Sequence, residues 1–258
     1  MNFEIIDVNS TNLDKYGLFC KKSQKKEVGY KNKIEWIKER FKEGLKYKLL
    51  RIREQNKVSL GGFIEYIPGK YNWRGIEADD WMVIHCIWIV GKFKKKGYAS
   101  RLLEECMKDA AEVGMQGIVC MTAEKGGWLP NKRLFEKHGF KKIDEFKPYF
   151  GLYAKALSDK ARLPKFFPIS NDKIKEYDTR VTVLYSHQCP YISRTIEEIR
   201  DFAETKALSF QAINLKSCKE AQQNQIHPYG TYCIFSDGKL LSYIPGERRR
   251  ILDLLNEK

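Results

Sequence analysis

The chain of 258 residues lacks the features that mark membrane and secreted proteins. No apolar run approaches the roughly 20 residues that an α-helix needs to cross a bilayer. The start of the chain (MNFEIID) has neither the basic segment nor the apolar core of a signal peptide. With 43% hydrophobic residues, the sequence can still form real cores. We therefore expect a cytoplasmic protein with one large or two modest domains.

Patterns for metal binding and for disulfides are missing as well. The cysteines are odd in number, scattered and nowhere spaced as Cys-x-x-Cys: Cys20, Cys86, Cys106, Cys120, Cys189, Cys218 and Cys233. This spacing fits neither a disulfide framework nor a zinc site. The histidines are few and widely separated: His85, His138, His187 and His227. We therefore predict no metal centre.

Acidic residues are in the minority, and the net charge is +14. Residues 1–155 hold 31 Lys and Arg against 20 Asp and Glu, so most of the excess lies there. A basic domain attracts nucleic acid, membrane phosphates or a polyanionic cofactor. Because no segment resembles a nucleic-acid motif or a membrane anchor, we expect no nucleic-acid or membrane partner. A phosphorylated cofactor and a solvated surface would account for the charge.

Residues 85–103 (HCIWIVGKFKKKGYASRLL) carry the most information. An apolar, β-rich run over 81–90 breaks at Gly91, passes through a basic loop and enters a helix at small residues. The free N–H groups at a helix start and the positive end of the helix dipole both favour an anion beside the first turn of the helix. Gly97 and Ala99 would let a phosphate approach the main chain. An ordinary strand–turn–helix with a solvated lysine run is the alternative.

The loop KKKGYA, which starts at Lys94, resembles the acyl-CoA signature Gln/Arg-x-x-Gly-x-Gly/Ala of the GNAT family of N-acetyltransferases, with Lys94 in place of Gln or Arg. The resemblance implies acetyl-CoA as cofactor. It also implies that the main chain of Ile87 and Ile89 holds the thioester and the pantetheine arm. The residues implied to hold the pyrophosphate are Lys94, Lys95, Lys96, Gly97, Tyr98, Ala99 and Ser100. Ser100 is equally expected as a plain helix-start residue.

A second segment (NKRLFEKHGF), from Asn131 to Phe140, resembles the family region Asn-x-x-Ala-x-x-x-Tyr-x-x-x-Gly-Phe, shortened ahead of Phe135. In the family, the Asn bonds the pantetheine arm and the Tyr protonates the leaving thiolate. Phe135 takes the Tyr position and has no proton to give, so solvent, Tyr98 or another hydroxyl would replace it. Without a gap, Trp128 aligns with the family's Asn. Asn131 is then a pantetheine ligand if the helix starts late, and otherwise a helix cap.

Acetyl transfer to an amine needs a group that removes a proton from the ammonium form. The candidates are His85 on the central strand, Glu124 just past the next strand and Glu65 on the preceding strand. His85 has the alternative role of a satisfied core histidine. Glu124 has the alternative role of a solvated loop carboxylate.

The periodicity predicts an α/β fold in the GNAT order, a mixed β-sheet with flanking helices. The expected strands are 3–8, 47–53, 60–67, 81–90 and 117–122, followed by a closing pair within 142–153. The expected helices are 13–20, 34–41, 99–113 and 131–138. A long loop is expected over 68–80. We expect a GNAT domain over 1–155, a linker over 156–178 with prolines and no sustained period, and a second domain over 179–258.

The C-terminal part resembles a small thioredoxin/glutaredoxin-like domain. The segment HQCPYISR around Cys189 is similar to the glutaredoxin Cys-Pro-Tyr-Cys site, and a cysteine at a helix start has a lowered pKa. Ile192 stands where the resolving cysteine would be, and Gly230 stands where the family has a cis-proline before the third strand. A dithiol cycle is therefore not expected. A monothiol role for Cys189 and a scaffold role for the domain both stay open.

Together the two halves resemble the two-domain GNAT proteins with a YoaP-like, thioredoxin-like C-terminal domain. The leading interpretation is an acetyl-CoA-dependent N-acetyltransferase that acts on a small-molecule or peptide amine. The alternatives are an acyl-CoA-binding sensor or partner module, suggested by Phe135, and a monothiol redox protein, suggested by Cys189. Neither the acceptor amine nor the oligomeric state follows from the sequence.

Overall fold

The structure is a computed structural model that describes residues 2–55, 57–124, 128–168, 172–175, 177, 179–224 and 226–256. The chain forms two compact units. Unit 1 consists of Met1–Phe19, Ile37–Asn72 and Ile76–Phe166. Unit 2 consists of Cys20–Trp36, Trp73–Gly75 and Phe167–Lys258.

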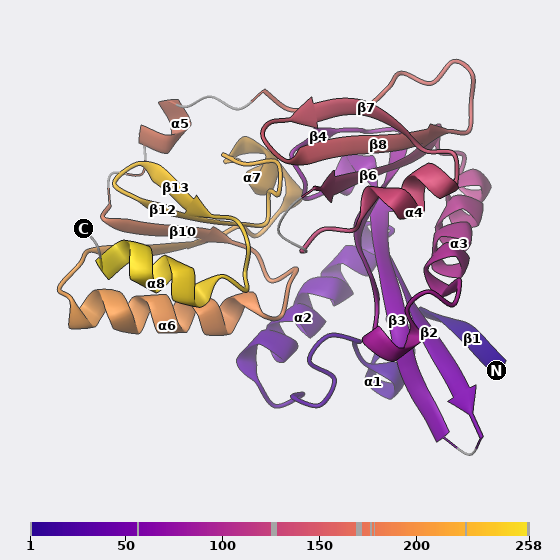
Figure 1. The fold of residues 1–258 in the computed structure, drawn as a ribbon, viewed down its shortest axis with the longest axis horizontal. Helices are drawn as coiled ribbons and strands as arrows, with labels where there is room; N and C mark the ends of the chain where they lie inside the picture. Colours follow the sequence, from indigo (N-terminus) through magenta and orange to yellow (C-terminus); the bar gives the residue numbers. More distant parts are fainter. Residues whose placement is uncertain are drawn as a thin grey trace. The chain divides into compact units, whose positions relative to one another are not determined.

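Unit 1 is built on a seven-stranded mixed sheet with the strand order β1-β2-β3-β5-β6-β8-β7 (Figure 1). The strands are β1 (Asn2–Val8), β2 (Lys46–Glu54), β3 (Lys57–Pro68), β5 (Trp81–Ile89), β6 (Gly117–Ala123), β7 (Lys141–Phe146) and β8 (Phe150–Ala156). Neighbouring strands are antiparallel, except that β5 and β6 run parallel. This is the mixed α/β arrangement that the sequence predicts.

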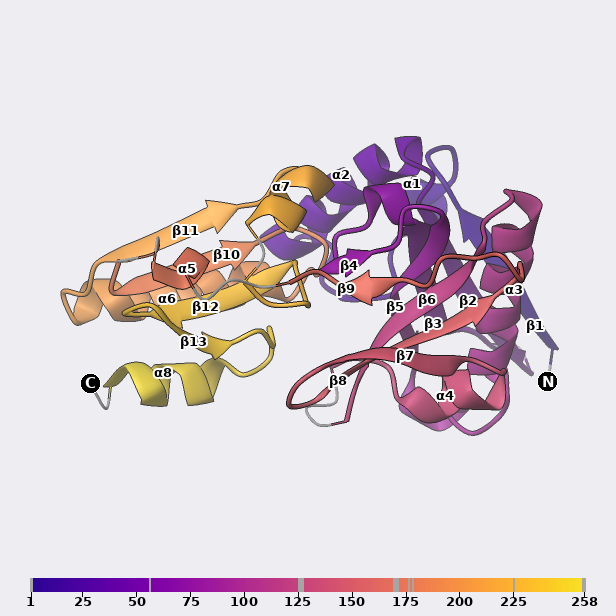
Figure 2. The same ribbon diagram turned by 90° about the horizontal axis from the view of Figure 1, so that it is seen from above.

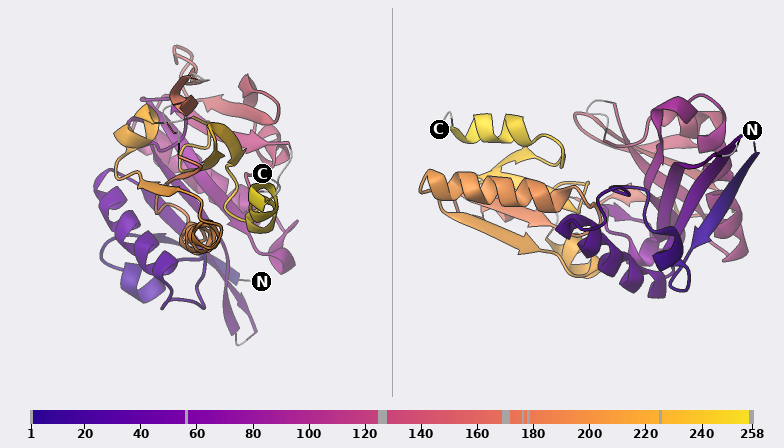
Figure 3. Two further views of the ribbon diagram at one scale, coloured as in Figure 1. Left: turned by 90° about the vertical axis from the view of Figure 1, so that its left-hand side faces the viewer. Right: turned by 90° about the horizontal axis from the view of Figure 1, so that it is seen from below.

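Helices cover both faces of this sheet. The helices α3 (Tyr98–Glu112) and α4 (Lys132–Lys137) lie on one face, and α1 (Leu13–Tyr16) lies on the other (Figures 1 and 3). The main core fills the space under α3 and α4. The helical spacing predicts a core stripe of Leu102, Leu103, Cys106, Met107 and Ala110 on α3, and all of these are fully buried there except Met107, which is half-buried. The helix α2 (Val28–Lys42) has its first part in unit 2 and its last turns in unit 1.

Unit 2 contains a four-stranded sheet with the order β11-β10-β12-β13. Its strands are β10 (Val181–Tyr185), β11 (Phe210–Asn214), β12 (Tyr232–Ser236) and β13 (Lys239–Ser242). The strands β10 and β11 are parallel, and the other two pairs are antiparallel. The helices α6 (Ile192–Thr205) and α8 (Arg248–Asn256) cover one face, and α7 (Cys218–Gln223) covers the other (Figures 1 and 2).

Some elements differ from the sequence-based expectation. The helix expected over 13–20 ends at Tyr16, because Gly17 adopts a left-handed φ of 66°. The expected loop 68–80 contains η1 (Gly69–Tyr71) and the short strand β4 (Ile76–Glu77). Strand β4 pairs with β9 (Lys165–Phe166), which lies within the expected linker, as does α5 (Asp172–Lys175). Residues 169–171, 176 and 178 of that linker lie outside the described residues.

Among the described residues, no helix is long and apolar enough to cross a membrane. Within the same ranges, no cluster of His, Cys, Asp and Glu side chains is arranged to hold a metal ion.

Candidate functional site

Strands β5 and β6 separate part-way along their length. Their parallel pairing runs from Trp81 opposite Gly117 to Ile84 opposite Cys120 and then stops, although both strands continue. On its other edge, β5 stays paired with β3 as far as Ile89. Backbone pairing is therefore interrupted between two adjacent strands in the middle of the sheet.

The main-chain polar groups of Ile87 and Ile89 face this interruption. The Val90 N–H donates to the Gly61 carbonyl at 2.9 Å, so the main chain of Val90 points toward β3. Because this direction alternates along an antiparallel strand, Ile89 and Ile87 point the opposite way. Their N–H and C=O groups therefore lie on the edge where β6 has moved away. An extended chain with amide groups, such as a pantetheine arm, fits such an edge.

Strand β5 leads through η2 (Gly91–Phe93) to the start of α3. Gly97 precedes the helix with a left-handed φ of 80°, and no side chain caps the helix. A Cβ placed on Gly97 would meet no heavy atom within 4 Å, so the space beside it is open. The first turn of α3 contains no acidic residue. Since first-turn N–H groups have no intrahelical acceptor, the residues present fit a phosphate group.

The basic loop supplies charge at the same place. The side chains of Lys94, Lys95 and Lys96 are exposed, and Lys94 Nζ lies 5.2 Å from the centre of the Trp88 ring. Tyr98 differs from its neighbours, because the residue is 7% exposed and its ring packs edge-on against Phe93. The Tyr98 ring therefore belongs to the core at the start of α3.

Asn131 and Phe135 have structural roles in α4. The Asn131 side chain accepts a hydrogen bond from the Arg133 N–H at 2.9 Å, so Asn131 is the N-cap of this helix. Phe135 is fully buried, with its ring centre 5.3 Å from that of Phe140. The structure contains the helix cap, which uses the amide oxygen of Asn131, and a pantetheine contact through the amide NH2 group stays a prediction.

The burial of Phe135 makes the variant Phe135→Tyr informative. We expect its turnover to be unchanged or increased, because the wild-type ring donates no proton. We expect its melting temperature to fall, since a hydroxyl buried without a partner costs about 1–3 kcal/mol. Free-CoA release and thermal unfolding measure the two effects. A large loss of turnover with intact cofactor affinity would show instead that substrate occupies the space at Phe135.

His85 and Glu65 form a buried pair. His85 directly follows the last β5–β6 pair, and its Nδ1 lies 3.5 Å from Glu65 Oε1. The exposed fractions of the two side chains are 0% and 2%. Both side chains are therefore closed off from solvent in this structure.

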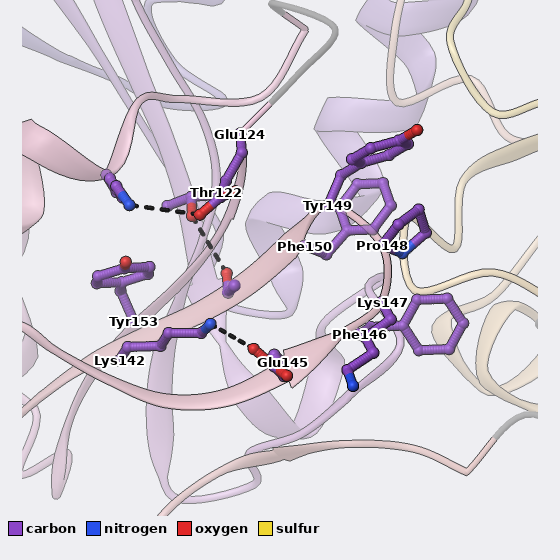
Figure 4. Close-up of a pocket in the computed structure, with 12 residues that line it drawn as sticks. Thr122, Glu124, Lys142, Glu145, Phe146, Lys147, Pro148, Tyr149, Phe150 and Tyr153 are labelled. Atoms are coloured by element: carbon purple, nitrogen blue, oxygen red, sulfur yellow. Dashed lines mark hydrogen bonds and ion pairs between the residues drawn. The ribbon is translucent and has the colours of Figure 1, made fainter.

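A pocket of about 120 Å³ lies at the C-terminal end of β6, between the start of α4 and the β7–β8 hairpin (Figure 4). Glu124 lines it with a 57% exposed side chain and pairs with Lys132 at 3.3 Å. Glu145 lines it as well and pairs with Lys142 at 2.5 Å. The aromatic lining consists of Phe146, Tyr149, Phe150 and Tyr153. The β6 residues that line the pocket come after Cys120, the last residue of β6 that pairs with β5.

Cys189 lies in unit 2, just before α6. Its exposure is intermediate, and its carbonyl accepts the Ile192 N–H at 3.3 Å in the first turn. The adjacent Gln188 accepts a hydrogen bond from Thr231 Oγ1 at 3.3 Å. Arg74, which is 3% exposed, donates to the same Thr231 oxygen and to the Tyr229 carbonyl. Through Thr231, the buried Arg74 guanidinium group is thus linked by hydrogen bonds to Gln188, the residue next to Cys189.

Comparison with known proteins agrees with the geometry of the sheet and the loop. Residues 19–140 match the model of the acetyltransferase (GNAT) family. The uncharacterized N-acetyltransferase YoaP of Bacillus subtilis (strain 168) is 35% identical over 241 residues, which cover 92% of each chain. The chain belongs to the GNAT family. It is an acetyl-CoA-dependent N-acetyltransferase with an amine acceptor.

Solved structures resemble part of the chain. A domain from Methanocaldococcus jannaschii is 18% identical, with a TM-score of 0.44, over 60% of this chain and 99% of that chain. A GNAT-family acetyltransferase from Staphylococcus aureus is 16% identical, with a TM-score of 0.43, over 61% of this chain and 100% of that chain.

Two residues near this GNAT site were not singled out from the sequence. His138 ends α4 and bonds Ser100, as described below. Tyr153 leans over Gly151, where a Cβ would lie 2.8 Å from the tyrosine ring. Its hydroxyl donates to Glu136 at 3.5 Å, and burial raises its pKa. Such packing has a sequence signal: a glycine lies two residues before an aromatic residue, so both are on the same face of the strand and the ring can cover the glycine.

Proposed function

We propose that the phosphates of acetyl-CoA bind at the start of α3 and that its pantetheine arm runs along the free edge of β5. The observation that supports this most is the end of β5–β6 pairing at Ile84, which leads directly to the open helix start at Gly97. In this proposal, the main chain of Ile87 and Ile89 binds the arm. The phosphate ligands are Lys94, Lys95, Lys96, Gly97, Tyr98, Ala99 and Ser100, with Tyr98 acting through its main chain.

Bound acetyl-CoA supplies the activated acetyl group for transfer. We propose Glu124 as the base that takes the proton from the acceptor ammonium, because its carboxylate is open to the pocket. The neutral amine nitrogen then forms the new amide bond as the carbon–sulfur bond breaks, and the nitrogen releases its second proton to solvent. With Phe135 buried, the leaving sulfur takes its proton from solvent. His85, oriented by Glu65, is the second candidate for the base.

The acceptor is proposed to be a small-molecule or peptide amine of cytoplasmic origin. A panel of such amines, tested by release of free CoA, examines this proposal. We expect release with at least one amine class and a rise in melting temperature with acetyl-CoA. Binding without release for every amine would favour the acyl-CoA-binding sensor or partner module instead.

We propose that unit 2 contains a thioredoxin-like domain over 179–258, that the linker is 156–178, and that the GNAT domain is 1–155. The parallel pair β10–β11, followed by the antiparallel strands β12 and β13, supports the thioredoxin-like assignment. The compact unit also includes residues 20–36 and 73–75. Gly75 donates to the Pro228 carbonyl, and a Cβ on Gly230 would lie 2.1 Å from the Trp73 carbonyl oxygen. Such tight packing favours a docking or scaffold role over a redox role.

Cys189 is predicted to be the most reactive thiol without being a dithiol catalyst. Its position before α6 favours the thiolate. We expect Cys189 to be alkylated faster than Cys218, which is also half-buried at a helix start. Mass spectrometry after brief alkylation near neutral pH measures this order. Equal rates would make Cys189 an ordinary residue.

The redox alternative is tested by insulin reduction with dithiothreitol. We expect no such activity, because Ile192 replaces the resolving cysteine. We expect Cys189→Ser to bind acetyl-CoA normally, since the proposed cofactor loop belongs to unit 1. Insulin reduction by the wild type that this variant lacks would support the redox role.

A further inference from the structure

A hydrogen bond joins the two helices of unit 1 that flank the proposed cofactor site. Ser100 lies in the first turn of α3, and His138 is the C-cap of α4. Ser100 Oγ and His138 Nε2 are 2.8 Å apart, and both residues are half-buried. The acetyl-transfer steps described above do not use His138. The proton-transfer steps of the reaction therefore do not explain this hydrogen bond.

The direction of this bond decides what Ser100 can offer to an anion. A serine hydroxyl has a single proton to donate. If His138 Nε2 carries a hydrogen, the ring donates to Ser100 Oγ, and the hydroxyl proton stays available for a phosphate oxygen. If Nε2 is bare, the hydroxyl donates to the ring and has no proton left for an anion. An anion at the start of α3 favours the first direction, because both bond dipoles then point toward it.

We propose that His138 positions the Ser100 hydroxyl to donate to the pyrophosphate of acetyl-CoA. This inference rests on the proposed phosphate site at the start of α3. His138 acts through Ser100 and does not touch the cofactor, so it is a positioning residue. The relay runs from the imidazole N–H to the serine oxygen, and from the serine hydroxyl to the phosphate.

The charges around His138 come from three elements. Burial lowers the pKa of His138, Glu104 of α3 raises it, and Lys137 of α4 and Lys155 of β8 lower it. The ring is therefore neutral at neutral pH in the free protein. A phosphate bound through Ser100 would raise this pKa, so that binding takes up a proton. Affinity through this relay should thus increase as the pH falls toward the pKa of His138.

Calorimetric titration of the full chain with CoA tests the relay by a double-mutant cycle. We expect Ser100→Ala to weaken binding about tenfold, since a hydrogen bond to a charged group is lost. We expect His138→Ala to weaken it about fivefold, because the hydroxyl loses its orientation. The double variant should bind like Ser100→Ala alone, since the effects of residues in one relay do not add. His138→Gln can still donate from its amide and should recover most of the loss.

Three further measurements separate positioning from a general structural effect. Dephospho-CoA keeps the pyrophosphate and lacks the 3′-phosphate, so His138→Ala should weaken both ligands by the same factor. The increase in affinity on lowering the pH from 7.5 to 5.5 should be larger in the wild type than in His138→Gln, whose side chain does not titrate. His187→Gln, a half-buried histidine of unit 2, should bind CoA normally.

Several results would overturn the relay. One is a His138→Ala variant that binds CoA as tightly as the wild type. Another is a His138→Ala substitution that still weakens binding when Ser100 has already been replaced by Ala. A third is a His138→Ala variant that loses affinity for CoA but not for dephospho-CoA. A wild-type protein that binds no CoA would overturn the proposed phosphate site itself. Melting temperatures without ligand identify any variant that has simply lost its fold.

Discussion

Replacement of Gly97 by Glu is expected to abolish the rise in melting temperature that acetyl-CoA gives to the wild-type protein. Ligand binding to the native state raises this temperature through mass action. The new carboxylate would enter the open space at the start of α3, where the cofactor phosphates are proposed to bind. Repulsion between the two anions, together with the left-handed φ of 80°, which disfavours any side chain, removes the site. Thermal unfolding with and without millimolar acetyl-CoA measures the effect.

Gly114→Glu provides a matched control on the same helix. Gly114 follows the other end of α3, has a left-handed φ of 72° and also has open space where a Cβ would lie. The control therefore introduces the same strain and the same charge away from the phosphates. We expect it to keep the full acetyl-CoA shift. A shift retained by Gly97→Glu would place the phosphates elsewhere, and a wild type without any shift would contradict acetyl-CoA binding.

The fold of the GNAT part could be predicted because its elements are encoded in local periodicity. The α3 stripe and the apolar runs of β5 and β6 are long enough to identify, and the structure differs from the predicted bounds there by only a residue or so. Some short elements were not predicted. Helix α7 has few apolar positions, although Ser217 caps its start by accepting a hydrogen bond from the Glu220 N–H. The pair β4–β9 joins distant two-residue segments that no local pattern reveals.

In the candidate site, too, local features could be predicted from sequence and contacts between distant segments could not. A glycine at a left-handed φ and a helix start are local features, so the loop around Gly97 could be recognised from sequence. The bond from Ser100 to His138 and the pair of Glu65 with His85 join separate segments and depend on how the helices and strands pack. For Asn131 the sequence allowed two roles, and the hydrogen bond from the Arg133 N–H shows that the residue caps α4, while its role as a pantetheine ligand stays a prediction.

Glu124→Gln is expected to lower kcat/KM at neutral pH by at least about 100-fold, the usual lower range for a lost general base. Glutamine keeps the size of the side chain but cannot take the proton. The affinity for acetyl-CoA should not change, because the proposed phosphate and pantetheine ligands lie elsewhere in unit 1. The loss should shrink as the pH approaches the pKa of the acceptor amine, about 10 for a lysine-like amine, since the acceptor then arrives deprotonated. A pH profile of kcat/KM measures both effects.

Two variants decide whether this loss reports proton transfer. Glu145→Gln changes another lysine-paired carboxylate in the same pocket, and we expect it to keep most of the activity at every pH. A carboxylate that only anchored Lys132 would weaken the pocket at all pH values alike, so an alkaline recovery separates a base from an anchor. His85→Gln addresses the other candidate. In one outcome, His85→Gln loses activity at neutral pH and recovers it at alkaline pH, while Glu124→Gln keeps the wild-type rate. The base is then the buried histidine, and the acceptor reaches it where β5 and β6 separate.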